Sequence, residues 1–322
     1  MMSQRLFYIL IFVLLVACKK DQGNLTPIAV LDTGTSCRIN DLELLSSGRW
    51  VACSGVRNEK GFISVSDDAG VSWTSSKLDH ASSAYTIDFL DSLNGYAGGD
   101  FLHLWKTTDG GLSWEYQWLG NQVPMNEEDR PAVRDFHMLN DSVWFFCGGE
   151  NLGEGVVYET SDRGHSWQFV FNQHEYRALC TNDDDLVVGG HGSILRSNEG
   201  LNNLEPAHFE NDFIMDVIRA DDGAWIAASY QGAVYRSQDG LNWSNVMKGG
   251  RRLSQVVNWT CLTKSGHRII VAGTDGAIAE SSDHGLNWTR YNVNDAPDFW
   301  SLLIDGNQVF AGSEEGKIFR IF

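Results

Sequence analysis

The chain has 322 residues, with 12 Trp, 33 Gly and only 5 Pro, a composition typical of many short strands joined by tight turns and not of a low-complexity chain. Its 24 Lys and Arg stand against 42 Asp and Glu, which gives a formal net charge of -18. Such a surface repels phosphate backbones, and no basic stripe reverses the field, so nucleic acid is excluded as a partner.

Residues 1–17 have the pattern of a targeting segment. Arg5 supplies a sparse positive charge, and residues 6–16 form an uncharged apolar run that is short for a bilayer span of ~20 residues. Leu15-Val16-Ala17-Cys18 resembles the lipobox of bacterial lipoproteins, in which the cysteine is lipidated and becomes the mature N-terminus. We expect a signal peptide over 1–17, a lipid on Cys18 and a tether over 18–24; an ordinary secretory leader is the alternative.

One octapeptide recurs through the rest of the chain. Residues 66–73 have the form S-x-D-x-G-x-S-W. Full copies follow at 107–114, 160–167 and 281–288, and degenerate copies begin at 197 and 237. The acidic positions 68, 109, 162, 199, 239 and 283 are 37 to 53 residues apart, which is the length of one four-stranded propeller blade.

Each octapeptide ends a unit of strand, turn, strand, turn and strand, and residues 298–322 form a last unit that lacks its outermost strand. The segment 25–33 can supply that strand and close the ring, which removes the open sheet edges. We therefore predict an all-β fold, a single seven-bladed β-propeller over 25–322. The expected blades are 36–80, 83–120, 131–173, 175–210, 212–250, 254–294, and 298–322 completed by 25–33.

The repeated Asp residues are expected to be structural. In each octapeptide the Ser or Thr and the Asp can hydrogen-bond across a turn between the third and fourth strands, Gly permits the turn, and Trp packs beneath it. Five cysteines follow the leader without metal-ligand spacing, and we expect buried single thiols. No residue pattern indicates a cofactor, a metal site or a catalytic group.

The innermost strands begin on the face opposite the octapeptide turns, so their first residues are expected to converge on the mouth of the central channel. These residues are cations and flat aromatics: Arg38, Tyr85, Arg134, Arg177, Trp259 and Trp300. Such groups suit carboxylates, sugars or a peptide segment. The alternative is that the aromatics only plug the channel while the arginines pair with Asp41 and Asp135.

Three loops are longer than the repeat requires, and surplus loops on one rim are where repeat proteins often carry contacts. Residues 118–131 hold Glu127, Glu128 and Arg130; residues 148–155 hold Glu150; residues 248–254 hold Arg251 and Arg252. We predict these charged residues as rim contacts, with solvated insertions as the alternative.

The octapeptides resemble those of the bacterial neuraminidase repeat superfamily, and the photosystem II assembly factor family fits best. Its unit reads roughly I-x-F-x-D-x-x-x-G-Y-A-x-G, continuing to T-x-D-G-G-x-T-W, and residues 87–114 follow it closely. The resemblance implies a seven-bladed propeller that serves as a rigid extracytoplasmic platform for another protein. Related chains occur in bacteria without a photosystem, so the resemblance does not imply a photosynthetic role.

We therefore expect a membrane-anchored lipoprotein, at the periplasmic face or on the surface of the outer membrane, that binds a protein or a glycan at the channel face. A sialidase-like glycosidase is the alternative function. Sialidases carry an Arg-Ile-Pro-like motif, which this sequence lacks. A glycosidase needs two carboxylates about 5 to 9.5 Å apart in a cleft, with Asp135 as one candidate acid.

Overall fold

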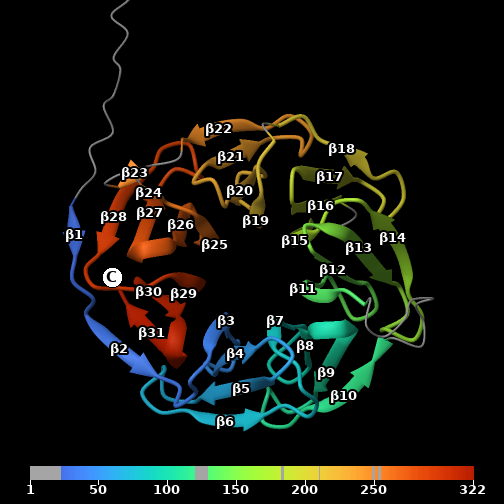
Figure 1. The fold of residues 1–322 in the computed structure, drawn as a ribbon, viewed down its shortest axis with the longest axis horizontal. Helices are drawn as coiled ribbons and strands as arrows, with labels where there is room; N and C mark the ends of the chain where they lie inside the picture. The colour runs from blue at the N-terminus through green and yellow to red at the C-terminus, as the bar shows by residue number, and fades with distance from the viewer. Residues whose placement is uncertain (1–22, 120–129, 183–184, 210, 249–250, 253–254) are drawn as a thin grey trace, which may run out of the picture.

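The structure is a computed structural model that describes residues 23–119, 130–182, 185–209, 211–248, 251–252 and 255–322. Within these residues the strands form seven blades arranged in a ring around a central channel (Figure 1). Each of the first six blades contains four antiparallel strands that follow one another along the chain. The predicted seven-bladed propeller is confirmed. The signal peptide, Cys18 and most of the tether lie outside the described residues.

The first four blades are each built from consecutive strands. The first blade consists of β3 (Arg38–Leu44), β4 (Trp50–Val56), β5 (Lys60–Ser66) and β6 (Thr74–Lys77), and the second of β7 (Ala84–Phe89), β8 (Gly95–Gly99), β9 (His103–Thr107) and β10 (Glu115–Trp118). The third blade consists of β11 (Ala132–Met138), β12 (Trp144–Glu150), β13 (Gly153–Thr160) and β14 (Gln168–Asn172). The fourth consists of β15 (Tyr176–Asn182), β16 (Asp185–Gly190), β17 (Ser193–Ser197) and β18 (Glu205–Pro206). A short 3-10 turn, η1 (Asp100–Leu102), joins β8 to β9.

The last three blades include the two ends of the ring. The fifth blade consists of β19 (Ile214–Arg219), β20 (Trp225–Ser229), β21 (Val234–Ser237) and β22 (Ser244–Met247). The sixth contains β25 (Trp259–Ser265), β26 (Arg268–Gly273), β27 (Ala277–Ser281) and β28 (Thr289–Val293). The seventh contains β29 (Phe299–Asp305), β30 (Gln308–Ser313) and β31 (Lys317–Arg320). The 3-10 turns η4 (Thr274–Gly276) and η5 (Glu314–Gly316) lead into β27 and β31. A small hairpin, β23 (Arg251–Arg252) with β24 (Gln255–Val256), lies between the fifth and sixth blades along the chain.

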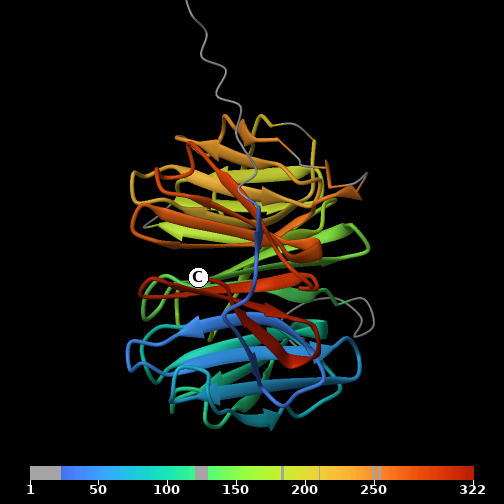
Figure 2. The ribbon, with the colours of Figure 1, turned by 90° about the vertical axis from the view of Figure 1, so that its left-hand side faces the viewer.

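The N-terminal segment closes the ring, as predicted. Strand β2 (Ala29–Asp32) pairs antiparallel with β31, from Ala29 opposite Arg320 to Asp32 opposite Lys317, and becomes the outermost strand of the seventh blade. An additional strand, β1 (Asn24–Leu25), pairs in parallel with β28 of the sixth blade. The segment therefore runs along the outer rim and joins two blades (Figure 2).

The octapeptide turns make the predicted hydrogen bonds. In the first copy Asp68 accepts bonds from the Ser66 hydroxyl at 2.8 Å and from the Ser72 amide at 2.8 Å, and the Trp73 indole N–H donates to the Gly70 carbonyl at 2.9 Å. Gly70 has a φ of +81°, a conformation that glycine adopts without strain. The repeated Asp residues thus hold the turn between the third and fourth strands.

The apolar core lies between adjacent blades, because the sheets pack face to face around the ring. Ile63 of the first blade packs with Ile87 and Trp105 of the second, and Ile226 of the fifth packs with Ile269 of the sixth. The thiols are part of this core, as predicted: the five described cysteines are free, Cys37, Cys53, Cys147 and Cys261 are buried, and Cys180 is half-buried. Across the described residues, the structure contains no helix of the length and apolar character needed to cross a membrane.

Candidate functional site

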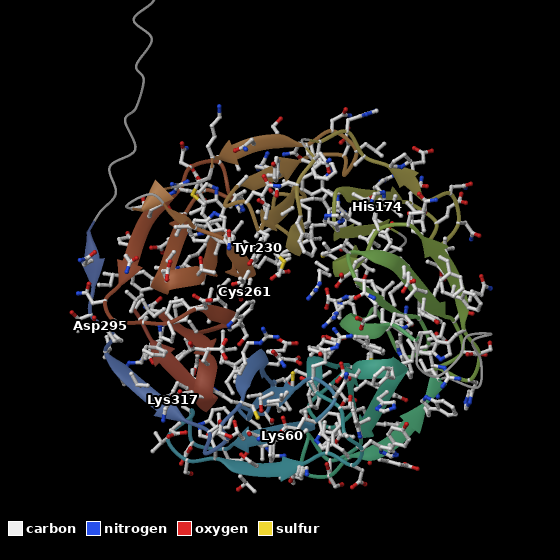
Figure 3. All side chains as sticks on the ribbon, in the orientation of Figure 1. Lys60, His174, Tyr230, Cys261, Asp295 and Lys317 are labelled. Carbon is white, nitrogen blue, oxygen red and sulfur yellow. The ribbon has the colours of Figure 1, made fainter. Side chains whose placement is uncertain are left out.

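Every inner strand carries a β-bulge near its start, and the extra residue points into the channel. A bulge inserts one residue that has no partner on the neighbouring strand, which re-aims its side chain. The seven bulge residues are Asn40, Tyr85, Arg134, Arg177, Met215, Thr260 and Trp300. All seven line one cavity of about 900 Å³. Figure 3 shows the side chains around the central channel of the ring.

Five of the six predicted channel-mouth residues lie at this cavity. Tyr85, Arg134, Arg177 and Trp300 are bulge residues, and Arg38 lies two positions before the bulge residue of its strand. The prediction for Trp259 is wrong. Its side chain is 2% exposed, packs in the core between two blades, and donates an indole hydrogen bond to the Gly232 carbonyl at 2.8 Å.

The error at Trp259 has a simple geometric cause. Side chains alternate between the two faces of a strand, so a shift of one residue moves a side chain to the opposite face. Trp259 directly precedes the bulge residue Thr260, and it is Thr260 that lines the cavity. Asn40 and Met215 are the other two bulge residues that the sequence did not predict.

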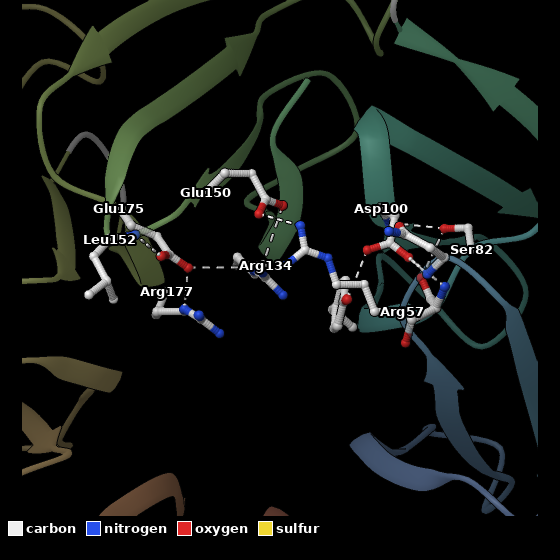
Figure 4. Close-up of polar contacts among 11 residues, drawn as sticks. Arg57, Ser82, Asp100, Arg134, Glu150, Leu152, Glu175 and Arg177 are labelled. Atoms are coloured by element: carbon white, nitrogen blue, oxygen red, sulfur yellow. Dashed lines mark hydrogen bonds and ion pairs between the residues drawn. The ribbon is translucent and has the colours of Figure 1, made fainter. Parts of the chain in front are cut away.

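Two of the arginines are held by carboxylates from the third and fourth blades. Arg177 Nε lies 2.6 Å from Glu175 Oε1, and Arg134 Nε lies 3.7 Å from the same oxygen (Figure 4). Glu150 Oε1 is 3.8 Å from Arg134, and Glu150 Oε2 is 2.5 Å from Arg57. The alternative considered for these arginines was pairing with Asp41 and Asp135, and the structure pairs them with Glu150 and Glu175 instead.

Glu175 is the anchor of this cluster. Its side chain is 2% exposed, and its Oε2 accepts the Leu152 amide at 2.9 Å while Oε1 faces the two arginines. Burial, and secondarily the charge of Arg134, lowers the pKa of Arg177 to about 10, so the guanidinium stays charged at neutral pH. The cluster is a fixed network that presents guanidinium groups to the channel mouth.

Tyr85 links the arginines to the second blade. Its hydroxyl donates to Asp100 at 2.8 Å, and the guanidinium carbon of Arg134 lies 4.5 Å from its ring centroid. Asp100 is 2% exposed and also accepts the amides of Asn58 and Ser83. These buried contacts fix the orientation of the Tyr85 ring.

Arg38 differs from the other arginines because no ion pair joins it to a carboxylate within the described part of the chain. Its Nε donates to Asn40 at 2.6 Å, and its guanidinium carbon lies 4.3 Å from the ring centroid of Trp300. The Trp300 indole in turn donates to Glu314 at 2.8 Å. Arg38 and Trp300 line both the channel cavity and a second cavity of about 610 Å³ beside it.

Deeper in the channel, four half-buried aspartates join neighbouring blades. Asp41, Asp135 and Asp216 directly follow bulge residues, and each accepts an amide of the next blade. The donors are Ile87 at 2.9 Å, Leu179 at 2.7 Å and Leu262 at 2.6 Å, and Asp88 accepts the Met138 amide at 2.5 Å in the same way. These four residues are called the channel aspartates below.

Burial raises the pKa of the channel aspartates, although the backbone hydrogen bonds act in the opposite direction. The pKa of Asp41 rises to about 6, those of Asp88 and Asp135 to about 7, and that of Asp216 well above its usual range. Asp135 also accepts the Phe136 amide, so both of its oxygens are engaged. The residue considered as a glycosidase acid is therefore a clamp between blades.

The predicted rim residues have different environments. Glu127 and Glu128 lie outside the described residues, and of Arg251 and Arg252 only the backbone pairing of β23 with β24 is described. Arg130 is 7% exposed, with its guanidinium carbon 4.3 Å from the Trp118 ring. Glu150 is the rim residue that joins the channel-mouth cluster.

Sequence reasoning missed Arg57, Asp100 and Glu175 at this site. Arg57 and Asp100 lie on turns between second and third strands, and Glu175 directly precedes an inner strand. The sequence held a signal for these residues, because charged residues recur in the turns between second and third strands, which lie on the channel face. In the described ranges, no group of three or more His, Cys, Asp or Glu is arranged to hold a metal ion.

The fold and the site together define a seven-bladed propeller with an arginine-lined channel mouth. Residues 65–261 match the family described as photosynthesis system II assembly factor YCF48, and because this is more than half of the sequence, the chain belongs to that family. A comparison with curated proteins finds no match.

Solved structures share this fold at low sequence identity. One described as YCF48 bound to D1 peptide is 20% identical, with a TM-score of 0.69, over 92% of this chain and 97% of that chain. YCF48 from Cyanidioschyzon merolae is 12% identical, with a TM-score of 0.65, over 91% and 98%. A chain of the mitotic checkpoint complex is 11% identical, with a TM-score of 0.72, over 99% of both. At these identities the likeness concerns the fold.

Proposed function

We propose that this propeller is an extracytoplasmic lipoprotein that captures a carboxylate-bearing segment of a partner protein at its channel mouth, outside photosynthesis. The observation that carries the proposal is Arg38, whose guanidinium lies over the Trp300 ring, lines two neighbouring cavities and forms no ion pair among the described residues. A carboxylate is the natural complement of such a group, because a guanidinium binds carboxylates with paired, charge-assisted hydrogen bonds.

Two further observations support a peptide as the ligand. The channel mouth combines cations with aromatic faces, a combination that suits polypeptide segments. A solved structure of similar fold, described as YCF48, has a D1 peptide bound. The overall charge of -18 repels acidic partners at long range, so the mouth arginines would act at short range, after encounter.

The test is capture of a partner by the full-length protein in intact cells, using chemical cross-linking and mass spectrometry. Arg38→Gln should lose a partner that the wild type captures through cross-links at the channel mouth, with a melting temperature within a few degrees. Arg163→Gln is the matched control, because Arg163 lies on an octapeptide turn with its side chain 65% exposed. Equal capture by Arg38→Gln and the wild type would refute the proposal.

Anchoring through Cys18 is tested separately by metabolic labelling with an azide-bearing fatty acid. The wild type should carry the label and sediment with membranes, whereas Cys18→Ala should carry none. A labelled Cys18→Ala variant, or an unlabelled wild type, would remove the lipoprotein part of the proposal and leave the binding part standing.

A further inference from the structure

The second cavity of about 610 Å³ forms a groove that leads from Arg38 and Trp300 to the fourth and fifth blades. It shares Arg177 and Met215 with the channel. Its remaining wall has an apolar and aromatic part, formed by Leu152, His191, Phe213 and Tyr230, and a polar part, formed by Gly192, Asn211, Asp212 and Gln231. A groove of this size and character is in the range of pockets that bind small ligands or side chains.

Two walls of the groove are large apolar side chains exposed to solvent. Leu152 is 48% exposed and Tyr230 is 43% exposed. Most exposed large apolar residues of this chain lie elsewhere, as Leu112 does on an octapeptide turn. Leu152 and Tyr230 instead face one cavity, beside cations, where an apolar group of a ligand would cover both.

The backbone of Leu152 is held firmly although its side chain is free. Its φ of +65° is unusual for a residue with a branched side chain and costs of order 1 kcal/mol or more. Its amide donates to Glu175 at 2.9 Å, and its carbonyl oxygen lies 3.0 Å from His191 Nδ1 and accepts the Glu175 amide at 3.3 Å. The contact that fixes the arginine network thus also fixes the apolar wall.

Phe213 forms the aromatic part of the wall. Its ring lies 5.5 Å from that of His191, 6.2 Å from that of Tyr230, and 5.6 Å from the guanidinium carbon of Arg177. The Tyr230 amide donates to the Phe213 carbonyl at 2.8 Å, so Tyr230 and Phe213 are also joined through the backbone. An apolar surface and a guanidinium therefore meet at one ring.

We infer that this groove selects a partner segment in which a carboxylate stands next to a large apolar side chain, the carboxylate binding Arg38 and the apolar group contacting Leu152, Phe213 and Tyr230. The inference rests on the proposed function and adds a sequence preference to it. The carboxylate belongs either to the end of a chain or to an Asp or Glu side chain, and both sources offer the same chemistry to a guanidinium.

The test uses fluorescein-labelled peptides titrated against the full-length protein by fluorescence polarisation. Gly-Ser-Gly-Ser-Gly-Phe with a free carboxylate should bind about tenfold more tightly than the same peptide ending in Ala, because covering roughly half of a phenylalanine side chain contributes ~1.4 kcal/mol. The carboxamide of the Phe peptide should bind weakly. Gly-Ser-Phe-Glu-Ser-Gly-carboxamide tests whether an internal carboxylate serves as well.

Leu152→Gly is the informative variant, since glycine suits the positive φ and the substitution relieves strain instead of disturbing the fold. It should reduce the preference for Phe over Ala to about threefold or less, whereas Leu112→Ala, an exposed apolar residue on the opposite face, should leave the preference intact. Equal binding of the Phe and Ala acids would overturn this inference and leave the proposed function standing. If the Phe acid binds no more tightly than its carboxamide, the proposed function fails as well.

Discussion

The guanidinium carbon of Arg38 lies 4.3 Å from the ring centroid of Trp300, which places a cation of the first blade over an aromatic ring of the seventh. The same two blades meet deeper in the ring, where the Ser301 hydroxyl donates to the Ile39 carbonyl at 3.3 Å. The stack therefore lies at the seam where the two ends of the chain close the ring. A cation fixed in this way is pre-organised for a ligand, because little side-chain entropy remains to be lost on binding.

Trp259 and Trp300 should respond differently to truncation. Trp259→Ala removes a fully buried indole between two blades and should lower the free energy of unfolding by about 3–5 kcal/mol. Trp300→Ala removes a half-buried ring at the channel mouth, so it should cost clearly less stability while weakening capture of the partner. Urea denaturation of both variants measures the difference. Similar losses of stability would contradict the assignment of Trp259 to the core.

Arg177→Ala should destabilise the protein by about 2–4 kcal/mol, because it leaves the buried carboxylate of Glu175 without its closest cation. Glu175→Gln combined with Arg177→Ala should recover part of this loss, since no buried charge then remains unpaired. A double-mutant cycle by denaturant unfolding gives the coupling between the two residues. Independent, additive effects would show that the pair at 2.6 Å contributes nothing.

The stability contributed by Asp135 should decrease as the pH rises. Its pKa is raised to about 7 in the folded protein, so the folded state binds the proton more tightly than the unfolded state does. The contribution is therefore greatest below the unfolded pKa of about 3.9 and is lost as the pH rises through 7. The melting temperature of the wild type relative to that of Asp135→Asn should therefore fall from pH 5 to pH 8.

Asp162, in an octapeptide turn, serves as the opposite case. Hydrogen bonds from Ser166, and then from Thr160, lower its pKa to about 2. Its contribution is present above the unfolded pKa and is lost as the pH falls from about 4 toward 2. The difference between the wild type and Asp162→Asn should stay constant from pH 8 to pH 5 and shrink only below pH 4. If the stability of Asp162→Asn and that of Asp135→Asn, each relative to the wild type, changed with pH in the same direction, the distinction between octapeptide and channel aspartates would be refuted.

Ring closure by β2 can be tested on two adjacent residues. Leu31 packs against the core between the first and seventh blades, whereas Val30 is 50% exposed on the other face of the strand. Leu31→Ala should cost about 2–3 kcal/mol, and Val30→Ala about 0.5 kcal/mol or less. Thermal unfolding with a check of oligomeric state by light scattering distinguishes them. Equal effects would mean that β2 does not seal the blade.

The repeats made the fold predictable because each octapeptide marks one turn through local hydrogen bonds. Asp68 and its equivalents act on residues only two to four positions away, so sequence spacing carries the information. The closure by β2 was also predictable, because the last unit lacks a strand. The pairing of β1 with β28 was not, since a two-residue parallel contact leaves no pattern in the sequence.

The channel site was predictable only in part, because the sequence does not show directly which residue of each inner strand faces the channel. The bulge decides which residue of an inner strand faces the channel, and counting from the expected strand start gives Trp259 in place of Thr260. In three blades the bulge residue directly precedes a channel aspartate, as Arg134 precedes Asp135. The position of that aspartate in the sequence would have shown which residue faces the channel. The ion-pair partner Glu175 could not be assigned, because contacts between blades depend on how neighbouring turns meet in space.

The division of the seventh blade between both ends of the chain also sets an order of events during synthesis. Asp32 forms an ion pair with Lys317, 285 residues later, and β2 has no antiparallel partner until β31 exists. The earlier blades consist of local hairpins that can form as soon as they emerge, whereas ring closure must await the synthesis of β31. A ribosome that stalls before β31 is made would thus leave an open ring, in which β2 and the edge of β30 lack their partner and are available to other chains.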